Sequence, residues 1–184
     1  MIIYSGTGNG YSATVNDENR LHVDAHTLSK FAAVSKEDSD AYSWTAISAD
    51  VAAGVGGIHL VNTSSTKNLH IGKIFLWADV PTQFKIWSPA TYTVPNGTSI
   101  VGLNLNRSSS SAAEATCTAN ETSNAFAAAQ TLLTVRNNEA TADEFGLSVD
   151  FDGALILGYH NAVAVELVAD TAAFECTIFG YFHD

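Results

Sequence analysis

From residue 43 to residue 182 the chain alternates short runs of apolar and polar residues, and clusters of Gly, Asn, Asp and Ser separate the runs. Alternation with a period of two is typical of half-buried β-strands, and turn-forming residues end each strand. The pattern predicts an all-β fold, either an antiparallel β-sandwich or a jelly-roll-like barrel. We expect one such domain at residues 41–184, preceded by an extended N-terminal arm with short strands at residues 1–40.

The predicted arm contains three glycines between Gly6 and Gly10, which favour a flexible start or a hinge. Residues 11–16 and 20–25 predict two short strands, and residues 36–40 predict a charged loop. The glycines lack the G-x-G-x-x-G spacing and the following helix that a phosphate-binding loop needs. We therefore predict no nucleotide cofactor.

Within the domain, residues 57–62 and 68–77 flank a polar loop and predict a hairpin. The second of these strands is predicted to carry apolar residues on both faces, with Leu69, Ile71, Phe75 and Trp77 on one and Ile74 and Leu76 on the other. Such a strand is expected at the centre of a sheet or at an interface. Further along, residues 125–133 predict a short helix capped by Ser123 or Asn124, or else a strand over residues 131–136.

Four strands are predicted in the last third of the chain, with consecutive antiparallel pairing as the simplest topology. They cover residues 146–151, 154–157, 162–168 and 173–181. The last one places Phe174, Cys176, Ile178 and Phe182 on one face and Glu175, Thr177, Phe179 and Tyr181 on the other. Its aromatic outer face favours a partner surface or a locally covered sheet.

Composition narrows the possible partners. The chain has 8 basic and 19 acidic residues, a formal net charge of -11, which opposes nucleic-acid binding and favours solubility. With 46% apolar residues, a core can form without disulfides, so Cys117 and Cys176 are predicted to be free buried thiols. Neither a secretory signal nor a bilayer-spanning run is predicted, which implies folding in a cytosol and no membrane partner.

Candidate chemistry is sparse. His59 and His70 are predicted to be cross-strand neighbours, and no histidine lies in a metal-binding motif. The segment Asp150 to Gly153 predicts a turn. The alternative is a calcium ion held there by oxygen ligands, with Asp143 and Glu144 as further carboxylates nearby. We predict a protein that is not an enzyme and has no catalytic, cofactor or metal residues. The alternative from another class is a carbohydrate-binding module that presents Trp44, Trp77, Trp87 and Tyr92.

Two stretches resemble a known group of proteins. The segment GNGYSATVNDENRLHVDA at residues 8–25 and the segment VGLNLNRSSSSAAEAT at residues 101–116 resemble virion structural proteins of tailed bacteriophages. The resemblance implies a jelly-roll-like β domain displayed on a phage particle, often as an oligomer. It also implies an extended N-terminal segment that engages neighbouring subunits.

The working hypothesis from the sequence is a capsid decoration or cement protein in the virion, assembled in the host cytoplasm. The expected partners are the major capsid protein or other virion proteins, and further copies of the chain in a homotrimer. A tail- or fibre-associated virion protein is the alternative within the same group.

Overall fold

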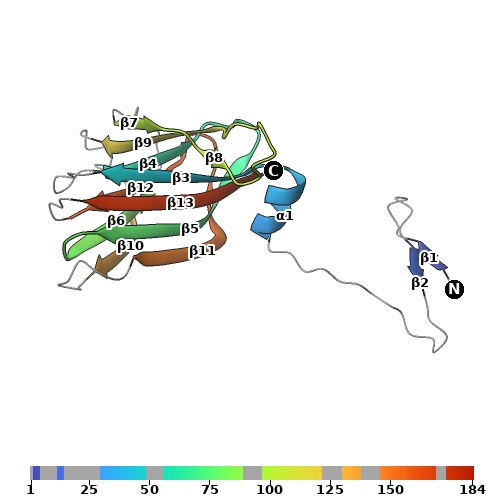
Figure 1. Cartoon of the computed structure of the whole chain (residues 1–184), viewed down its shortest axis with the longest axis horizontal. Helices are drawn as coiled ribbons and strands as arrows, with labels where there is room; N and C mark the ends of the chain where they lie inside the picture. Colours follow the sequence, from blue (N-terminus) through green and yellow to red (C-terminus); the bar gives the residue numbers. More distant parts are fainter. Residues whose placement is uncertain are drawn as a thin grey trace.

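A computed structural model of the chain describes residues 30–48, 56–88, 97–121, 130–137, 146–168 and 173–184, together with two short strands at residues 2–4 and 12–14. The larger part of these residues forms two antiparallel sheets packed face to face (Figure 1). One sheet has the order β10 (Gln130–Asn137), β6 (Thr82–Ser88), β12 (Ala162–Leu167), β4 (Gly56–Asn62), β9 (Ala115–Glu121) and β7 (Thr98–Ile100). The other has the order β11 (Leu147–Leu157), β5 (Asn68–Ala78), β13 (Phe174–His183), β3 (Ala41–Ser48) and β8 (Leu103–Asn104). Neither order closes on itself, so the all-β prediction is confirmed in its sandwich form.

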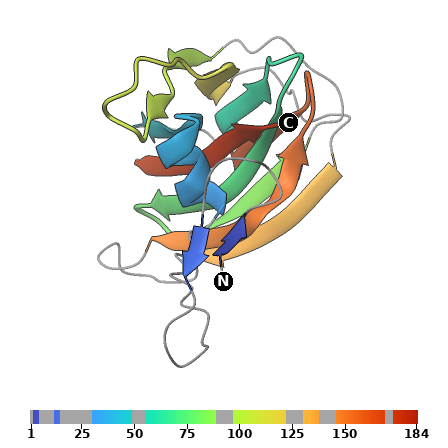
Figure 2. The same cartoon turned by 90° about the vertical axis from the view of Figure 1, so that its right-hand side faces the viewer.

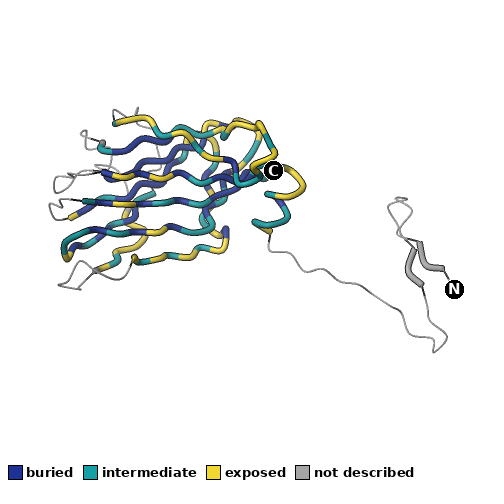
Figure 3. The backbone as a smooth tube through the Cα atoms, viewed as in Figure 1, coloured by how far each residue is buried: buried dark blue, intermediate teal, exposed yellow. Residues whose placement is uncertain are grey.

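The core lies between the two sheets, where inward-facing residues of both are buried (Figure 3). Its largest fully buried side chains include those of Trp44, Tyr42, Phe84 and Phe174. Cys117 and Cys176 are buried in the same core and are free thiols, as predicted. Burial raises the pKa of the Cys176 thiol well above its ordinary value, and the neighbouring Cys117 adds to the effect. The thiol is therefore protonated and inert at neutral pH.

The predicted hairpin at residues 57–77 is wrong, because β4 and β5 belong to different sheets. The buried Asn62 holds the chain at this crossing: its side-chain amide donates hydrogen bonds to the carbonyls of Leu157 at 2.8 Å and Lys67 at 2.9 Å. Its side-chain oxygen accepts the N–H of Ser64 at 2.9 Å. These hydrogen bonds satisfy the buried polar groups at the point where the chain crosses from one sheet to the other. β4 and β5 therefore face the same core from opposite sides.

Consecutive pairing of the C-terminal strands is also wrong. β11 pairs with β5, β12 lies in the other sheet between β6 and β4, and β13 returns to pair with β3 and β5. The two predicted strands at residues 146–157 form one strand, because Asp152 and Gly153 make a bulge within β11 instead of ending it. From β10 to β13, successive strands therefore alternate between the two sheets.

The predicted faces of β5 hold only for its first half. Lys73 pairs with Phe179 while Ile71 pairs with Gly180, so Gly72 is an extra residue opposite β13. One extra residue exchanges the two faces beyond it. The buried set is therefore Leu69, Ile71, Ile74, Leu76 and Ala78, while Phe75 is 43% exposed. β5 is an internal strand of its sheet, between β11 and β13, but it is not the central one.

In the middle of the chain, residues 130–137 form the strand β10, so the strand alternative is confirmed there and the helix is wrong for residues 130–133. The rest of the predicted helix, with its caps, lies outside the described residues. The last strand, β13, buries the predicted set Phe174, Cys176, Ile178 and Phe182.

The N-terminal region contains a helix that the sequence did not predict. α1 (Lys30–Glu37) packs against β13 and β3 at one end of the sandwich (Figures 1 and 2). Its Val34 is 1% exposed and forms a small cluster with Ala41 and Tyr181. β1 (Ile2–Tyr4) and β2 (Ser12–Thr14) pair with one another in a separate antiparallel sheet. The glycine run and the predicted strand at residues 20–25 lie outside the described residues.

Candidate functional site

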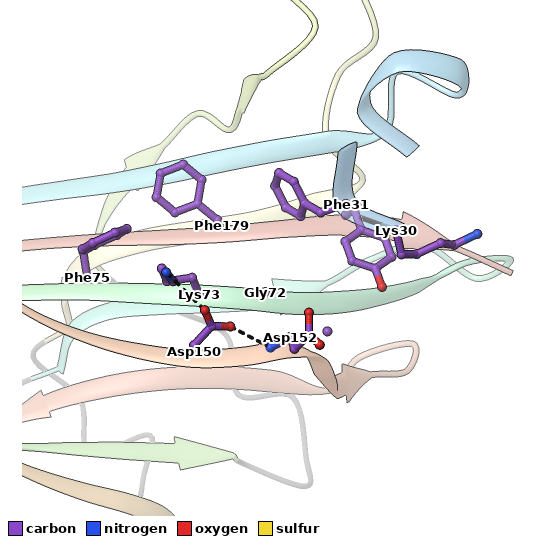
Figure 4. A pocket seen from close by; sticks show the side chains of 10 residues that line it. Lys30, Phe31, Gly72, Lys73, Phe75, Asp150, Asp152 and Phe179 are labelled. Atoms are coloured by element: carbon purple, nitrogen blue, oxygen red, sulfur yellow. Dashed lines mark hydrogen bonds and ion pairs between the residues drawn. The ribbon is translucent and has the colours of Figure 1, made fainter. Parts of the chain in front are cut away.

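A groove of about 390 Å³ lies between α1 and the outer side of the five-stranded sheet (Figure 4). Its volume is in the range of small-ligand and peptide sites. Aromatic rings form one side of it and two carboxylates the other. The lining residues come from α1, β5, β11 and β13, and they are Lys30, Phe31, Gly72, Lys73, Phe75, Asp150, Asp152, Gly153, Phe179 and Tyr181.

Two bulges create this groove. Gly72 is the extra residue of β5, and residues 151–154 of β11 have no partner between the pairs Asp150–Lys73 and Leu155–Ile71. Asp152 and Gly153 both have positive φ, 48° and 78°. A Cβ atom at Gly153 would lie 2.6 Å from the Tyr181 hydroxyl oxygen, so this position requires glycine for space as well as for conformation.

The charges in the groove are largely paired. The Lys73 ammonium lies 3.1 Å from the Asp150 carboxylate and 5.6 Å from the centre of the Phe75 ring. Asp150 also accepts the backbone N–H of Asp152 at 2.9 Å. This backbone hydrogen bond, helped by Lys73, lowers the pKa of the Asp150 carboxyl group. The Asp150 carboxylate is therefore ionised at neutral pH.

Aromatic contacts fix the end of the groove below α1. The Phe31 ring meets Tyr181 edge to face at 5.8 Å, and His70 stacks on Tyr181 at 5.0 Å. The Nδ1 atom of His70 lies 3.1 Å from the Gly153 carbonyl oxygen. Burial, together with the nearby Asp152, raises the pKa of the Tyr181 hydroxyl. Tyr181 is thus a neutral packing residue that joins α1 to the bulge of β11, and this end of the predicted aromatic face is locally covered.

In the described part of the chain, the histidines and carboxylates singled out from the sequence do not gather into one site. Among the described residues, no three His, Cys, Asp or Glu side chains come together as a metal site. Asp143 and Glu144, which would complete the calcium alternative, lie outside the described residues. His59 and His70 are in different sheets, so their predicted cross-strand contact is wrong. His22 and His26 lie outside the described part.

The tryptophans do not form a common platform. Trp44 is fully buried in the core. Trp77 lies on β5 and Trp87 on β6, so they belong to different sheets, and each alternates with buried neighbours that face the core. Their rings therefore face opposite sides of the sandwich. Tyr92 lies outside the described residues. The carbohydrate-binding alternative loses its main structural argument.

Comparison with known proteins adds no assignment: no family model, no curated protein and no solved structure matches this chain. In the described part of the chain, no helix has the length and apolar character needed to cross a membrane. The groove itself was not predicted, because it depends on two bulges and on α1. The only signals in the sequence were the aromatic outer residues of β13 and the Asp-Gly pair in β11.

Proposed function

We propose that this chain is a non-enzymatic structural protein of a virion, of the capsid decoration or cement type. In this proposal the sandwich is a stable body displayed on the shell, and the segment before α1 provides an attachment to neighbouring virion proteins. A tail- or fibre-associated position is the alternative within the same class.

The observation that carries the proposal is the separate pairing of β1 and β2. These strands are three residues each, and in the described part of the chain they pair with each other and with no strand of either large sheet. A two-stranded sheet of this size is at best marginally stable alone in water. Ile2, Ile3 and Tyr4 of β1 are apolar, so binding to another protein would bury them and offset the entropy of ordering the segment.

A second argument comes from the chemistry of the described residues. The groove combines aromatic rings with a paired lysine and carboxylate, and it offers a binding surface without an activated nucleophile. This supports a binding or structural role over an enzymatic one. It does not depend on the sequence resemblance to phage virion proteins, which points to the same class.

Co-sedimentation with purified phage heads that lack the protein tests the proposal. We expect the full chain to sediment with the heads, and a chain beginning at Lys30, which keeps α1 and the sandwich, to stay in the supernatant. Ile3→Asp in the full chain should weaken binding similarly, while Ser12→Ala should bind like the original chain. Near-UV circular dichroism checks that each variant keeps the sandwich fold.

Equal binding by the full chain and the chain beginning at Lys30 would show that attachment does not use the N-terminal sheet. Absence of binding to heads by the full chain, with binding to purified tails or fibres, would shift the assignment to the alternative.

A further inference from the structure

The edge strands of the two large sheets differ in how they are protected from other chains. β7 and β8, at one side of the sandwich, have only three and two residues. β11 carries a four-residue bulge and the charged residues Asp150 and Asp152. Short length, bulges and charges are the usual devices by which edge strands avoid pairing with another chain.

β10 has little of this protection. It is the end strand of the six-stranded sheet, eight residues long, and after a one-residue bulge at Leu132 it pairs regularly with β6 up to Asn137. Its sequence, Gln-Thr-Leu-Leu-Thr-Val-Arg-Asn, is rich in strand-forming residues and has Arg136 as its one charge. A regular, apolar edge of this kind is a template for another strand.

The apolar side chains of β10 are left partly uncovered. Leu132 is 46% exposed and Leu133 is 39% exposed. Leu133 pairs with the fully buried Ile86, so it belongs to the face that points into the sandwich. Its exposure means that the core remains open at this edge, where one more strand would cover it.

The charges near β10 allow a second copy of the chain to approach this edge. The chain carries a net charge of -11, so most surfaces of two copies repel one another. β10 and its neighbour β6 contain no carboxylate, and their charged residues are Arg136 and Lys85. The strands at this edge therefore bring no acidic groups of their own against a second copy, and unlike the two-residue β8 this edge is long enough to pair.

We propose that β10 pairs antiparallel with β10 of a second copy about a two-fold axis, which joins the two six-stranded sheets into one. In a register centred on Thr134, the two Thr134 residues lie opposite one another and Leu133 lies opposite Val135 of the second copy. Arg136 then faces Leu132 of the second copy, so no like charges oppose one another. Cross-strand threonine and aliphatic pairs of this kind are favourable. The inference does not rest on the virion proposal, and it gives a dimer in place of the homotrimer expected from the sequence.

Sedimentation velocity of the full chain over a range of concentrations tests the pairing. We expect the original chain to form a dimer, and Thr134→Lys and Thr134→Glu each to raise its dissociation constant at least about tenfold, because like charges then meet at the axis. An equimolar mixture of the two variants should recover the dimer, since lysine then faces glutamate. The matched control is Thr98→Lys, an exposed threonine on the opposite edge strand β7 of the same sheet, which should dimerise normally.

Recovery of the dimer in the mixture supports the proposal. It also shows that the two variants are folded, because unfolded variants could not form the dimer when mixed. A monomer at all concentrations would overturn it, and so would a trimer. An oligomer of the original chain that both Thr134 variants leave unchanged would overturn it as well.

Discussion

The sandwich and the N-terminal sheet of this chain are held together in very different ways. Among the described residues, the sandwich has eleven strands in two sheets around a common core. Its largest side chains, such as those of Trp44 and Phe174, are fully buried. The N-terminal sheet has two strands of three residues that pair with one another. α1 lies between them in the sequence and is attached to the sandwich by a small cluster around Val34.

This difference fits the division of roles in the function that we propose. Burial of apolar surface stabilises the sandwich without any partner. A sheet of two three-residue strands is marginally stable by itself, so under the proposed function a partner would provide most of its stability. Changes in the sandwich core should therefore affect folding, and changes in the N-terminal sheet should affect binding.

The largest expected effect is in the core of the sandwich. Phe174 is fully buried and its ring packs against Phe84 at 6.3 Å. Phe174→Ala should lower the free energy of unfolding by about 3–5 kcal/mol, because it removes a buried ring and leaves a cavity. The control is Phe75→Ala on the outer face, which is 43% exposed and should cost much less. Urea denaturation followed by tryptophan fluorescence measures both, and equal losses would contradict the placement of the core.

A smaller effect is expected where α1 joins the sandwich. Val34 is 1% exposed beneath the helix. Val34→Ala should cost about 1–2 kcal/mol of local stability, because it removes part of the apolar contact with Ala41 and Tyr181. Hydrogen exchange of α1 should accelerate while that of β5 and β13 stays unchanged. The control is Lys36→Ala at an exposed helix position, which should leave the exchange rates of α1 and of the two strands unchanged. Faster exchange in β13 with Val34→Ala would contradict the prediction, because it would show that α1 is part of the main folding unit.

The smallest effect concerns the ion pair between Lys67 and Asp40 at 2.5 Å. The hydrogen bond to Asp40 raises the pKa of Lys67 above its ordinary value of 10.5. At neutral pH and up to about pH 10.5 the pair therefore stabilises the fold, and this stabilisation is lost as the pH rises through the raised pKa of Lys67. Lys67→Met should cost up to about 1 kcal/mol at neutral pH, since the pair is partly exposed.

Denaturant midpoints of the original chain and of Lys67→Met, measured from pH 7 to pH 12, check this prediction. The difference between them should be constant at neutral pH and shrink at alkaline pH. A difference that persists unchanged to pH 12 would show that packing of the lysine stem, and not its charge, is responsible.

Local patterns in the sequence predicted much of the fold. The alternation of Phe174, Cys176 and Ile178 identified the buried face of β13, and the Asp-Gly pair marked an irregular point in β11. Strand pairing was not predictable in the same way, because the loop after Asn62 crosses between sheets through hydrogen bonds to distant residues such as Leu157. Local sequence looks the same for a hairpin and for such a crossing.

The groove was even harder to predict from the sequence than the strand pairing. A single extra residue, Gly72, exchanges the faces of β5 and brings Phe75 to the outer side. α1 has one buried residue, Val34, so its apolar periodicity is too short to predict a helix. Both features depend on contacts with β13, which is far away in the sequence.

Hydrogen exchange of the full chain, alone and bound to phage heads, tests the division of roles most directly. The account predicts rapid exchange of β1 and β2 in the free protein, slow exchange of β5 and β13, and a strong slowing confined to β1 and β2 on binding. Slow exchange of β1 and β2 in the free protein, or slowing on binding that appears only within the sandwich, would contradict it.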